Sequence, residues 1–248
     1  MRDSFVLLHG AWHGGWCWRD TAAALRSAGH RVTTPTLTGL GERSHQLGPQ
    51  VTLETMIADL ANHILWEELE GAILVGHSFG GAVVTGAADR VSGGLPGRLL
   101  GHLKGLIYLD ALWLEDGEAI VDTMDPALVA AREAAAAAHD GGLSLPAPPP
   151  EAFGITDPEQ QAWLQRRLTP HPLATYREKL RLQGPPGNGL PMHYVVCNAP
   201  PYETISPYAA RAAAAGLVMH DLAAPHDAMV THPKETADLL IACAAAMG

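Results

Sequence analysis

The chain has 248 residues, of which 47% are apolar, so it can bury a full hydrophobic core. Its 16 basic and 26 acidic side chains give a formal charge of −10, and no run of Lys or Arg forms a phosphate-binding patch, which argues against a nucleic-acid partner. The three cysteines are widely spaced, without a C-x-x-C pair or a disulfide framework, which favours a reducing cytoplasm.

A strand is predicted almost directly after Met1, and no apolar stretch reaches the about 18 residues that a membrane span needs. We therefore expect an intracellular, soluble protein with no signal peptide and no membrane partner. The sequence leaves a homodimer open.

Runs of β-forming residues alternate with helix-forming runs over the first 110 residues, which predicts a mostly parallel, doubly wound α/β sheet covered by helices on both faces. Thr52 is expected to cap the second predicted helix, with Thr55 at the position where a capping box usually has Glu. The predicted strands are 5–8, 31–34, 72–75 and 105–109, and the predicted helices are 18–28, 53–64 and 82–90.

The regular alternation stops after Asp110. Residues 113–190 are Ala-rich, then Pro-rich, then amphipathic over 163–168 and 176–182, which predicts an inserted helical cap within a single domain of residues 1–248. The remaining predicted elements are strand 193–197, helix 208–215, strand 217–219 and helix 233–247.

The pentapeptide Gly76-His77-Ser78-Phe79-Gly80 follows the apolar strand 72–75 and precedes a helix. In this setting a G-x-S-x-G sequence predicts a sharp strand-to-helix turn that presents the serine hydroxyl to solvent, with glycines where larger side chains would clash. Ser78 is therefore the candidate nucleophile.

A second glycine-rich loop, His9 to Gly15, follows the first predicted strand. A loop beside the serine turn can direct backbone N–H groups at the negative charge that develops on an attacked carbonyl oxygen. We expect the N–H groups of Ala11 and Phe79 to do so, Phe79 because it follows the serine and begins a helix. The alternative is that the glycines only permit a tight turn.

A serine hydroxyl needs a base near neutral pH, and an imidazole is the natural candidate. Among 13 histidines, His226 alone lies in a loop between the last predicted strand and the final helix. His77 flanks the serine but is expected to point the other way, His220 falls in or at the end of a strand, and His232 precedes a proline at a helix start.

These features, in the order serine, acid, histidine, resemble the α/β-hydrolase superfamily over nearly the whole chain. Four runs are similar to small bacterial esterases related to pyrethroid hydrolases and, more distantly, to plant methylesterases and hydroxynitrile lyases: 6–18, 36–45, 76–81 and 108–111. The resemblance implies a cofactor-free esterase in which Ser78 attacks an acyl carbon, His226 is base and then acid, and Ala11 and Phe79 hold the oxyanion.

The sequence departs from the superfamily at the acid. Members usually carry Asp shortly after the strand that is here 193–197, whereas this chain has no carboxylate there until Glu203. Asp110, at the end of strand 105–109, is the preferred candidate and Glu203 the alternative, while Asp227 is expected to point away from the His226 ring. Asp110 could also merely anchor a neighbouring loop.

Trp12, His13 and Trp113 are candidate substrate contacts, and an apolar or aromatic small-molecule ester would suit such a pocket. No metal site is expected, because His9 and His13 lack a carboxylate or Cys at ligand spacing. Besides a carboxylesterase, the sequence allows a lyase, decarboxylase or natural-product cyclase on the same fold, or a ligand-binding protein with little turnover.

Overall fold

The computed structural model describes residues 2–92 and 103–248, and its centre is a six-stranded sheet in which all neighbouring strands are parallel. The strand order is β2-β1-β3-β4-β7-β8. The strands are β1 (Ser4–Leu8), β2 (Arg31–Thr33), β3 (Ala72–His77), β4 (Gly105–Leu109), β7 (Met192–Cys197) and β8 (Val218–Leu222). The predicted α/β class and parallel sheet are confirmed.

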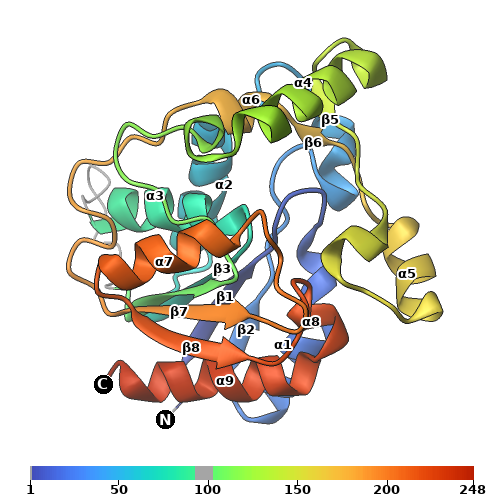
Figure 1. Cartoon of the computed structure of the whole chain (residues 1–248). Coiled ribbons are helices and arrows are strands. Elements are labelled where there is room, and N and C mark those ends of the chain that lie inside the picture. The colour runs from blue at the N-terminus through green and yellow to red at the C-terminus, as the bar shows by residue number, and fades with distance from the viewer. Residues whose placement is uncertain (1, 93–102) are drawn as a thin grey trace.

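Helices cover both faces of the sheet (Figure 1). α1 (Arg19–Ser27) and α9 (Pro233–Ala246) pack on one face, and α2 (Leu53–Trp66), α3 (Gly80–Ser92) and α7 (Ser206–Ala214) on the other. Side chains alternate along each strand, so Phe5 and Leu7 join the core under α1 and α9 while Val6 and Leu8 join the opposite core. The continuous apolar runs of the sequence follow from this burial on both faces.

The strand order reverses between β1 and β3. From β1 the chain first adds β2 on one side and then crosses to β3 on the other, so the loops after β1 and β3 diverge at their carboxyl ends. Open α/β sheets bind ligands in the crevice at such a point. The His9–Gly15 loop and Ser78 both leave the sheet there.

Most predicted boundaries agree with the structure within a few residues. Thr52 caps α2 and forms a reciprocal capping box with Thr55, as predicted. Three short helices were not predicted from the sequence: α8 (Ala228–Thr231) and the 3-10 helices Gly15–Trp18 and Gly41–Gln46. β8 begins one residue later than predicted and runs on to Leu222, because it pairs with β7 up to Cys197.

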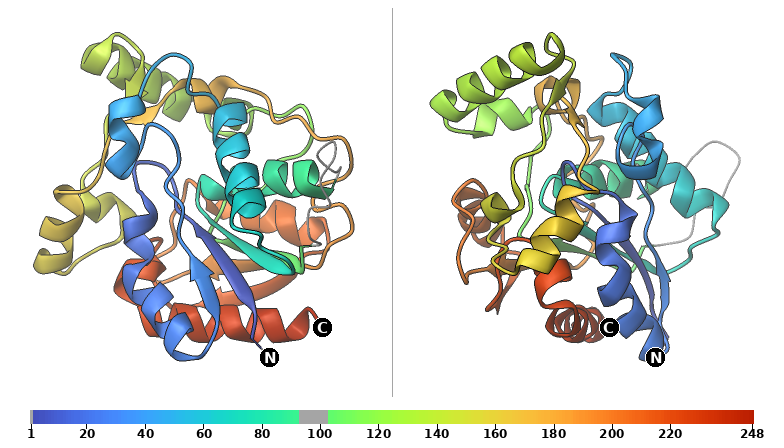
Figure 2. Two further views of the ribbon diagram at one scale, coloured as in Figure 1. Left: turned by 180° about the vertical axis from the view of Figure 1, so that it is seen from behind. Right: turned by 90° about the vertical axis from the view of Figure 1, so that its right-hand side faces the viewer.

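The segment between β4 and β7 forms the upper and right-hand part of the molecule in Figure 1 and lies outside the sheet and its helical layers (Figures 1 and 2). Its elements are a 3-10 helix at Ile120–Thr123, α4 (Pro126–Asp140), β5 (Ser144–Leu145), a 3-10 helix at Pro150–Phe153, α5 (Pro158–Gln165), β6 (His171–Pro172) and α6 (Ala174–Arg177). The limits 113–190 for an inserted cap stay a prediction.

The predicted amphipathic helix at 176–182 is wrong, because helix ends at Arg177. Beyond it the backbone pairs with a distant segment: Leu180 N–H donates to Glu118 O, and Leu180 O accepts from Gly117 N–H, both at 2.8 Å. Hydrogen bonds between two distant segments, as between strands, therefore pair the Leu180 N–H and C=O groups that a helix would have paired within itself. The helix predicted near Trp163 starts earlier, at Pro158, where Asp157 caps it.

Within the described residues, no helix combines the length and apolar character needed to cross a membrane. The three cysteines are free and buried.

Glycines permit the close contacts around the serine turn. A Cβ on Gly76 would lie 2.7 Å from Gly80 O, one on Gly80 would lie 2.7 Å from His9 O, and one on Gly81 would lie 2.2 Å from Leu112 O. Each of these neighbours is backbone, which cannot move aside cheaply. The glycines flanking Ser78 thus allow β3, α3 and the loops after β1 and β4 to meet.

We expect Gly81→Ala to lower the unfolding free energy by about 3 kcal/mol, because the new methyl must displace the Leu112 carbonyl. Gly29→Ala is the matched control: Gly29 has a φ of +93° but open space around it, so only the left-handed backbone resists, at about 1 kcal/mol. Urea unfolding of both variants measures the difference. Equal losses would contradict the packing argument.

Candidate active site

Ser78 directly follows β3 and precedes α3, in a left-handed backbone conformation with φ +52°. A non-glycine residue in this region is strained and is held there by its surroundings. The Ser78 carbonyl accepts hydrogen bonds from Gly81 N–H at 3.0 Å and Leu112 N–H at 2.9 Å, and Ser78 N–H donates to Leu109 O. The serine is partly exposed, whereas its neighbours His77 and Phe79 are buried.

Asp110 follows β4, the strand next to β3, and has the same kind of backbone, with φ +44°. Its N–H donates to Val195 O at 2.8 Å, and its carboxylate Oδ1 accepts from Cys197 N–H at 3.3 Å. The side chain is 3% exposed. Bonds to β7 therefore fix both the backbone and one carboxylate oxygen of Asp110, and leave Oδ2 for another donor.

That donor is His226, in the loop between β8 and α8. Its Nδ1–H donates to Asp110 Oδ2 at 2.6 Å, across 116 residues of sequence. With the proton on Nδ1, the neutral ring presents Nε2 as an acceptor, and Nε2 makes no hydrogen bond within the described part of the chain. The structure thus brings the preferred sequence candidate for the acid to the candidate base.

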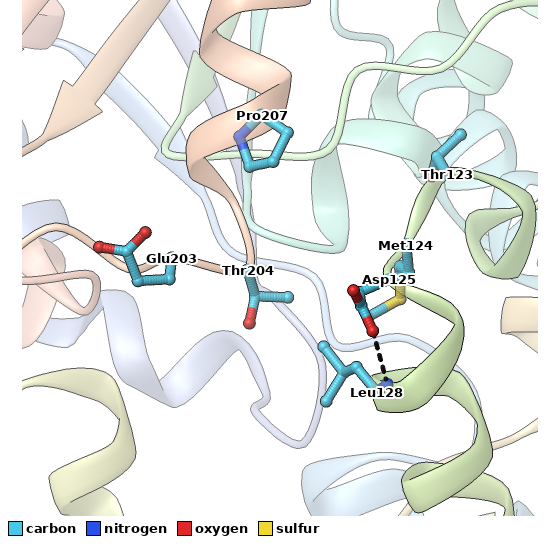
Figure 3. Close-up of a pocket in the computed structure, with 7 residues that line it drawn as sticks. All are labelled: Thr123, Met124, Asp125, Leu128, Glu203, Thr204 and Pro207. Carbon is cyan, nitrogen blue, oxygen red and sulfur yellow. Dashed lines mark hydrogen bonds between the residues drawn. The ribbon is translucent and has the colours of Figure 1, made fainter.

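Glu203, the alternative acid, is exposed and makes no hydrogen bond or ion pair with His226 among the described residues. Its side chain borders a separate cavity of about 230 Å³ next to the start of α4 (Figure 3). The other residues that line this cavity are Thr123, Met124, Asp125, Leu128, Thr204 and Pro207.

The loop after β1 lies against the serine turn, since a Cβ on Gly10 would lie 2.9 Å from Ser78 Cβ. Ala11 N–H and Phe79 N–H donate to no acceptor among residues 2–92 and 103–248. Both are buried, so each N–H lacks a partner that folding normally supplies. Two such donors beside a serine form a site that can accept an anionic oxygen.

His9 fixes the orientation of one of these donors. Leu37 N–H donates to His9 Nε2 at 3.1 Å, so the proton lies on Nδ1, which donates to Gly10 O at 2.8 Å. The Gly10 carbonyl and the Ala11 N–H belong to the same peptide group and point in opposite directions. Burial lowers the pKa of His9 to about 3, so the ring stays neutral and this arrangement persists at ordinary pH.

The three expected substrate contacts are all buried in this structure. Trp12 has a left-handed backbone with φ +65°, and its indole N–H donates to Leu145 O, at the β5 strand. Trp113 is 4% exposed, with Arg211 stacked over its ring at 6.0 Å. His13 is 1% exposed, and both of its ring nitrogens are hydrogen-bonded. Contact of any of the three with a substrate stays a prediction.

Sequence analysis missed the partner of His13, which is Asp227. His13 Nε2 lies 3.0 Å from Asp227 Oδ2, and His13 Nδ1 lies 2.7 Å from Ala11 O. The two residues are 214 positions apart, and no local pattern in the sequence links them. Both are fully enclosed, at 1% and 0% side-chain exposure, so this is a buried histidine–carboxylate pair beside the candidate base.

The two pKa shifts of the pair agree with an ionised state. Burial alone would lower the pKa of His13, but the Asp227 charge and hydrogen bond outweigh it and raise the pKa above 6.5. Burial would raise the pKa of Asp227, but the charge of His13 outweighs it and lowers the pKa. Since Ala11 O and Asp227 Oδ2 are both acceptors, His13 carries two N–H donors and a positive charge.

His77 lies toward His226 rather than away from the site. Its Nε2–H donates to the His226 carbonyl at 3.0 Å, and the two ring centroids are 4.6 Å apart. Burial, followed by repulsion from the neighbouring His226, lowers the pKa of His77 well below its usual value. His77 was expected to point the other way along the turn. In the structure its ring packs against the ring of His226.

Aromatic rings from other segments surround His226. Tyr202 lies 4.3 Å from the His226 ring and Phe153 6.3 Å, measured between centroids. His171 of β6 packs against Phe79 at 4.5 Å, and its Nδ1 accepts from Trp12 N–H at 3.4 Å. The segment between β4 and β7 therefore supplies rings to the site that the sequence did not assign.

Two groups of side chains among the described residues have ligand atoms close enough to hold a metal ion: His193, His220 and Cys243, and His77, His226 and Asp227. In the first, His193 Nδ1 and His220 Nε2 are 2.9 Å apart in nearly coplanar rings whose centroids are 5.1 Å apart. The two nitrogens therefore point straight at each other, which suits a shared proton and leaves no room for an ion. In the second, His77 Nε2 and His226 Nδ1 already donate hydrogen bonds.

The His13–Asp227 pair predicts a pH dependence of stability. Because its pKa is raised in the folded state, His13 contributes to the unfolding free energy fully below about pH 6.5, and this contribution is lost as the pH rises through the folded pKa. Because its pKa is lowered in the folded state, Asp227 makes a contribution that is lost as the pH falls through its folded pKa, below about pH 4. We expect the difference in unfolding free energy between wild type and His13→Gln to be largest from pH 4.5 to 6.5 and to shrink at higher pH, as measured by urea titration at each pH. A difference that stays constant up to pH 9 would contradict the charged pair.

Comparison with known proteins identifies the family of the chain. The model of the Alpha/beta hydrolase family matches residues 5–239. A carbendazim hydrolyzing esterase from Nocardioides sp. is 47% identical over 189 residues, covering 73% of this chain and 74% of the relative. An extracellular α/β-hydrolase from a Paenibacillus species aligns at 25% identity with a TM-score of 0.83, over 97% of this chain and 98% of its own.

The fold is shared further afield. The crystal structure of a pyrethroid hydrolase from Sphingobium faniae superimposes with a TM-score of 0.72 at 20% identity, over 99% of this chain and 98% of that one. The resemblance that the sequence motifs suggested is thus confirmed. With a family model spanning nearly all of its length and a curated esterase at 47% identity, the chain belongs to the α/β-hydrolase family and is one of its esterases.

Proposed function

We propose that this esterase hydrolyses carboxylic esters of small, fairly apolar molecules through an acyl-enzyme on Ser78. The observation that carries the proposal is the 2.6 Å bond from His226 Nδ1 to Asp110 Oδ2, beside a strained, partly exposed serine. Such a bond holds the imidazole in the tautomer whose Nε2 can take the serine proton.

In the first half of the reaction, Ser78 Oγ attacks the ester carbonyl as His226 Nε2 accepts its proton. The carbonyl oxygen becomes an anion, for which Ala11 N–H and Phe79 N–H are available donors. Asp110 stabilises the imidazolium that forms without itself being protonated. His226 then donates the proton to the leaving alcohol oxygen, the C–O bond breaks, and the acyl group remains on Ser78.

In the second half, a water molecule takes the place of the alcohol. His226 accepts a proton from water, hydroxide adds to the acyl carbon, and the proton returns to Ser78 Oγ as the acid product leaves. No step requires a cofactor or a metal.

The aromatic surroundings of His226 support an apolar ester with a planar group. Tyr202 and Phe153 flank the base, and Trp12 lies 6.0 Å from Phe153. Among the described residues no lysine or arginine forms an ion pair with Asp110 or His226, whereas Arg132 lies over the Trp12 ring at 5.8 Å. Carbendazim, named for the Nocardioides relative, is a sensible member of a test panel.

A histidine without a carboxylate partner would favour the lyase, decarboxylase or cyclase alternative. The bond from His226 Nδ1 to Asp110, at the end of β4, supports hydrolysis instead. No observation specifically favours a non-hydrolytic reaction.

A serine-directed phosphonate should label wild type on the peptide that contains Ser78 and abolish hydrolysis of p-nitrophenyl butyrate. Ser78→Ala should resist labelling and lose about 10⁵- to 10⁶-fold in kcat, because both steps need the Oγ atom. Mass spectrometry and a colorimetric assay measure the two effects. Labelling at another residue, or full turnover by Ser78→Ala, would refute the acyl-enzyme.

Asp110→Asn should lower kcat by about 10³- to 10⁴-fold, since an amide can favour the wrong tautomer of His226 and cannot stabilise its charge. Glu203→Gln is the matched control and should stay within about twofold of wild type, because Glu203 is exposed and Asp110, not Glu203, is bonded to His226 Nδ1. Steady-state kinetics on one ester decide between the two carboxylates. A reversed pattern would assign the role to Glu203.

A further inference from the structure

The His13–Asp227 pair has no part in the proposed proton transfers, yet it adjoins both halves of the site. Asp227 is the next residue after His226, and His13 lies two residues after Ala11. His13 bonds Asp227 Oδ2 through Nε2 and Ala11 O through Nδ1. The pair therefore connects the loop after β1 with the loop after β8.

A third loop joins them through His77, the residue before Ser78. His77 Nε2 donates to the His226 carbonyl at 3.0 Å and lies 3.8 Å from Asp227 Oδ1. Three buried side chains, His13, His77 and Asp227, thus link the loops that carry the oxyanion donor, the nucleophile and the base. Asp110 acts on the His226 ring, whereas these contacts act on the backbone on which the ring is mounted.

A purely structural role explains the pair poorly. Removing two charges from water costs free energy that their attraction often fails to recover, so apolar residues of similar size usually stabilise a fold equally well. Moreover, Asp227 Oδ1 is buried without a hydrogen-bond partner in the described structure. Without a hydrogen-bond donor, Asp227 Oδ1 keeps its negative charge density and exerts a negative potential on the neighbouring His77 and His226.

We propose that His13 and Asp227 are positioning residues for His226: the ion pair holds the loop after β8 against the loop after β1, so that the imidazole can both take the proton of Ser78 and deliver it to the leaving alcohol. This inference rests on the proposed acyl-enzyme mechanism. The other titratable groups that interact electrostatically with the pair are His77, His226, His9, Cys17 and Cys197, and Asp110 lies beyond the ring of His226.

The leaving group separates positioning of His226 from a general loss of structure. A p-nitrophenolate leaves without protonation, whereas an alkoxide needs a proton from His226 as the C–O bond breaks. A misplaced imidazole should therefore harm an alkyl ester more than a p-nitrophenyl ester of the same acid. A damaged oxyanion site or a partly unfolded population should harm both equally, since both esters develop the same oxyanion.

The experiment compares kcat/KM for p-nitrophenyl butyrate and ethyl butyrate in wild type, His13→Gln and Asp227→Asn, with active sites counted by phosphonate titration. We expect ethyl butyrate to lose about 10- to 100-fold more than the p-nitrophenyl ester in both variants, part of the usual contribution of acid–base catalysis. In His13→Gln the glutamine N–H can still reach Asp227, so the buried carboxylate keeps a donor. If Asp227→Asn does not fold, the ratio of the two esters in His13→Gln tests the proposal by itself.

His30→Gln is the matched control. His30 Nδ1 lies 3.8 Å from Asp3 Oδ2 in a second, largely buried histidine–carboxylate pair at the opposite end of the sheet, so its loss should leave the ratio of the two esters unchanged. An equal loss for both esters in His13→Gln, or no loss, would overturn the positioning role. Failure of phosphonate to label Ser78 in wild type would instead overturn the proposed function, and this inference with it.

Discussion

The hydrogen bond between Asp110 Oδ2 and His226 Nδ1 joins the two halves of the site, and the proposed chemistry depends on it. It fixes the tautomer of a histidine that lies in a loop between β8 and α8. Its geometry rests in turn on the sheet, because β7 binds Asp110 through Val195 O and Cys197 N–H and so orients the carboxylate independently of His226.

Backbone strain is concentrated at the same edge of the sheet. Five non-glycine residues in the described ranges have a left-handed backbone, and three of them are Trp12, Ser78 and Asp110, which follow β1, β3 and β4. Such residues persist where packing determines the backbone completely. Here the determinants are glycines that allow backbones to touch, at Gly10, Gly76, Gly80 and Gly81. These strained turns place the serine, the acid and the oxyanion donors at the carboxyl ends of the neighbouring strands β1, β3 and β4.

Much of this could be predicted from local patterns. Apolar runs of four to six residues gave the strands, because a parallel sheet buried on both faces needs them, and the serine pentapeptide with its flanking strand and helix gave the turn. Asp110 was preferred over Glu203 because it ends the preceding sheet strand, nearer the serine turn, and because some proteins that the sequence resembles carry their acid after that strand. The wrong helix at 176–182 followed from amphipathic spacing, which could not register that Leu180 pairs with Glu118 across more than 60 residues.

Long-range polar contacts were beyond prediction for a related reason. His13 was predicted to contact substrate, and His77 and Asp227 to point away from the serine and the His226 ring. Only the fold shows that Asp227, 214 residues further along the chain, bonds to His13. The rings of Phe153 and Tyr202 near His226 could not be predicted either, since Phe153 ends a short 3-10 helix, Tyr202 lies in the loop before α7, and neither segment has a periodic pattern. When a site is built from loops at the ends of several strands, the sequence predicts the individual loops but not the contacts between them.

The most direct test of this account is a crystal structure of the enzyme with a phosphonate bound to Ser78. We predict a covalent Oγ–P bond, a phosphonyl oxygen about 2.7–3.1 Å from both Ala11 N–H and Phe79 N–H, and Asp110 Oδ2 still on His226 Nδ1. A phosphonyl oxygen directed away from both N–H groups, or a carboxylate other than Asp110 on His226, would contradict it.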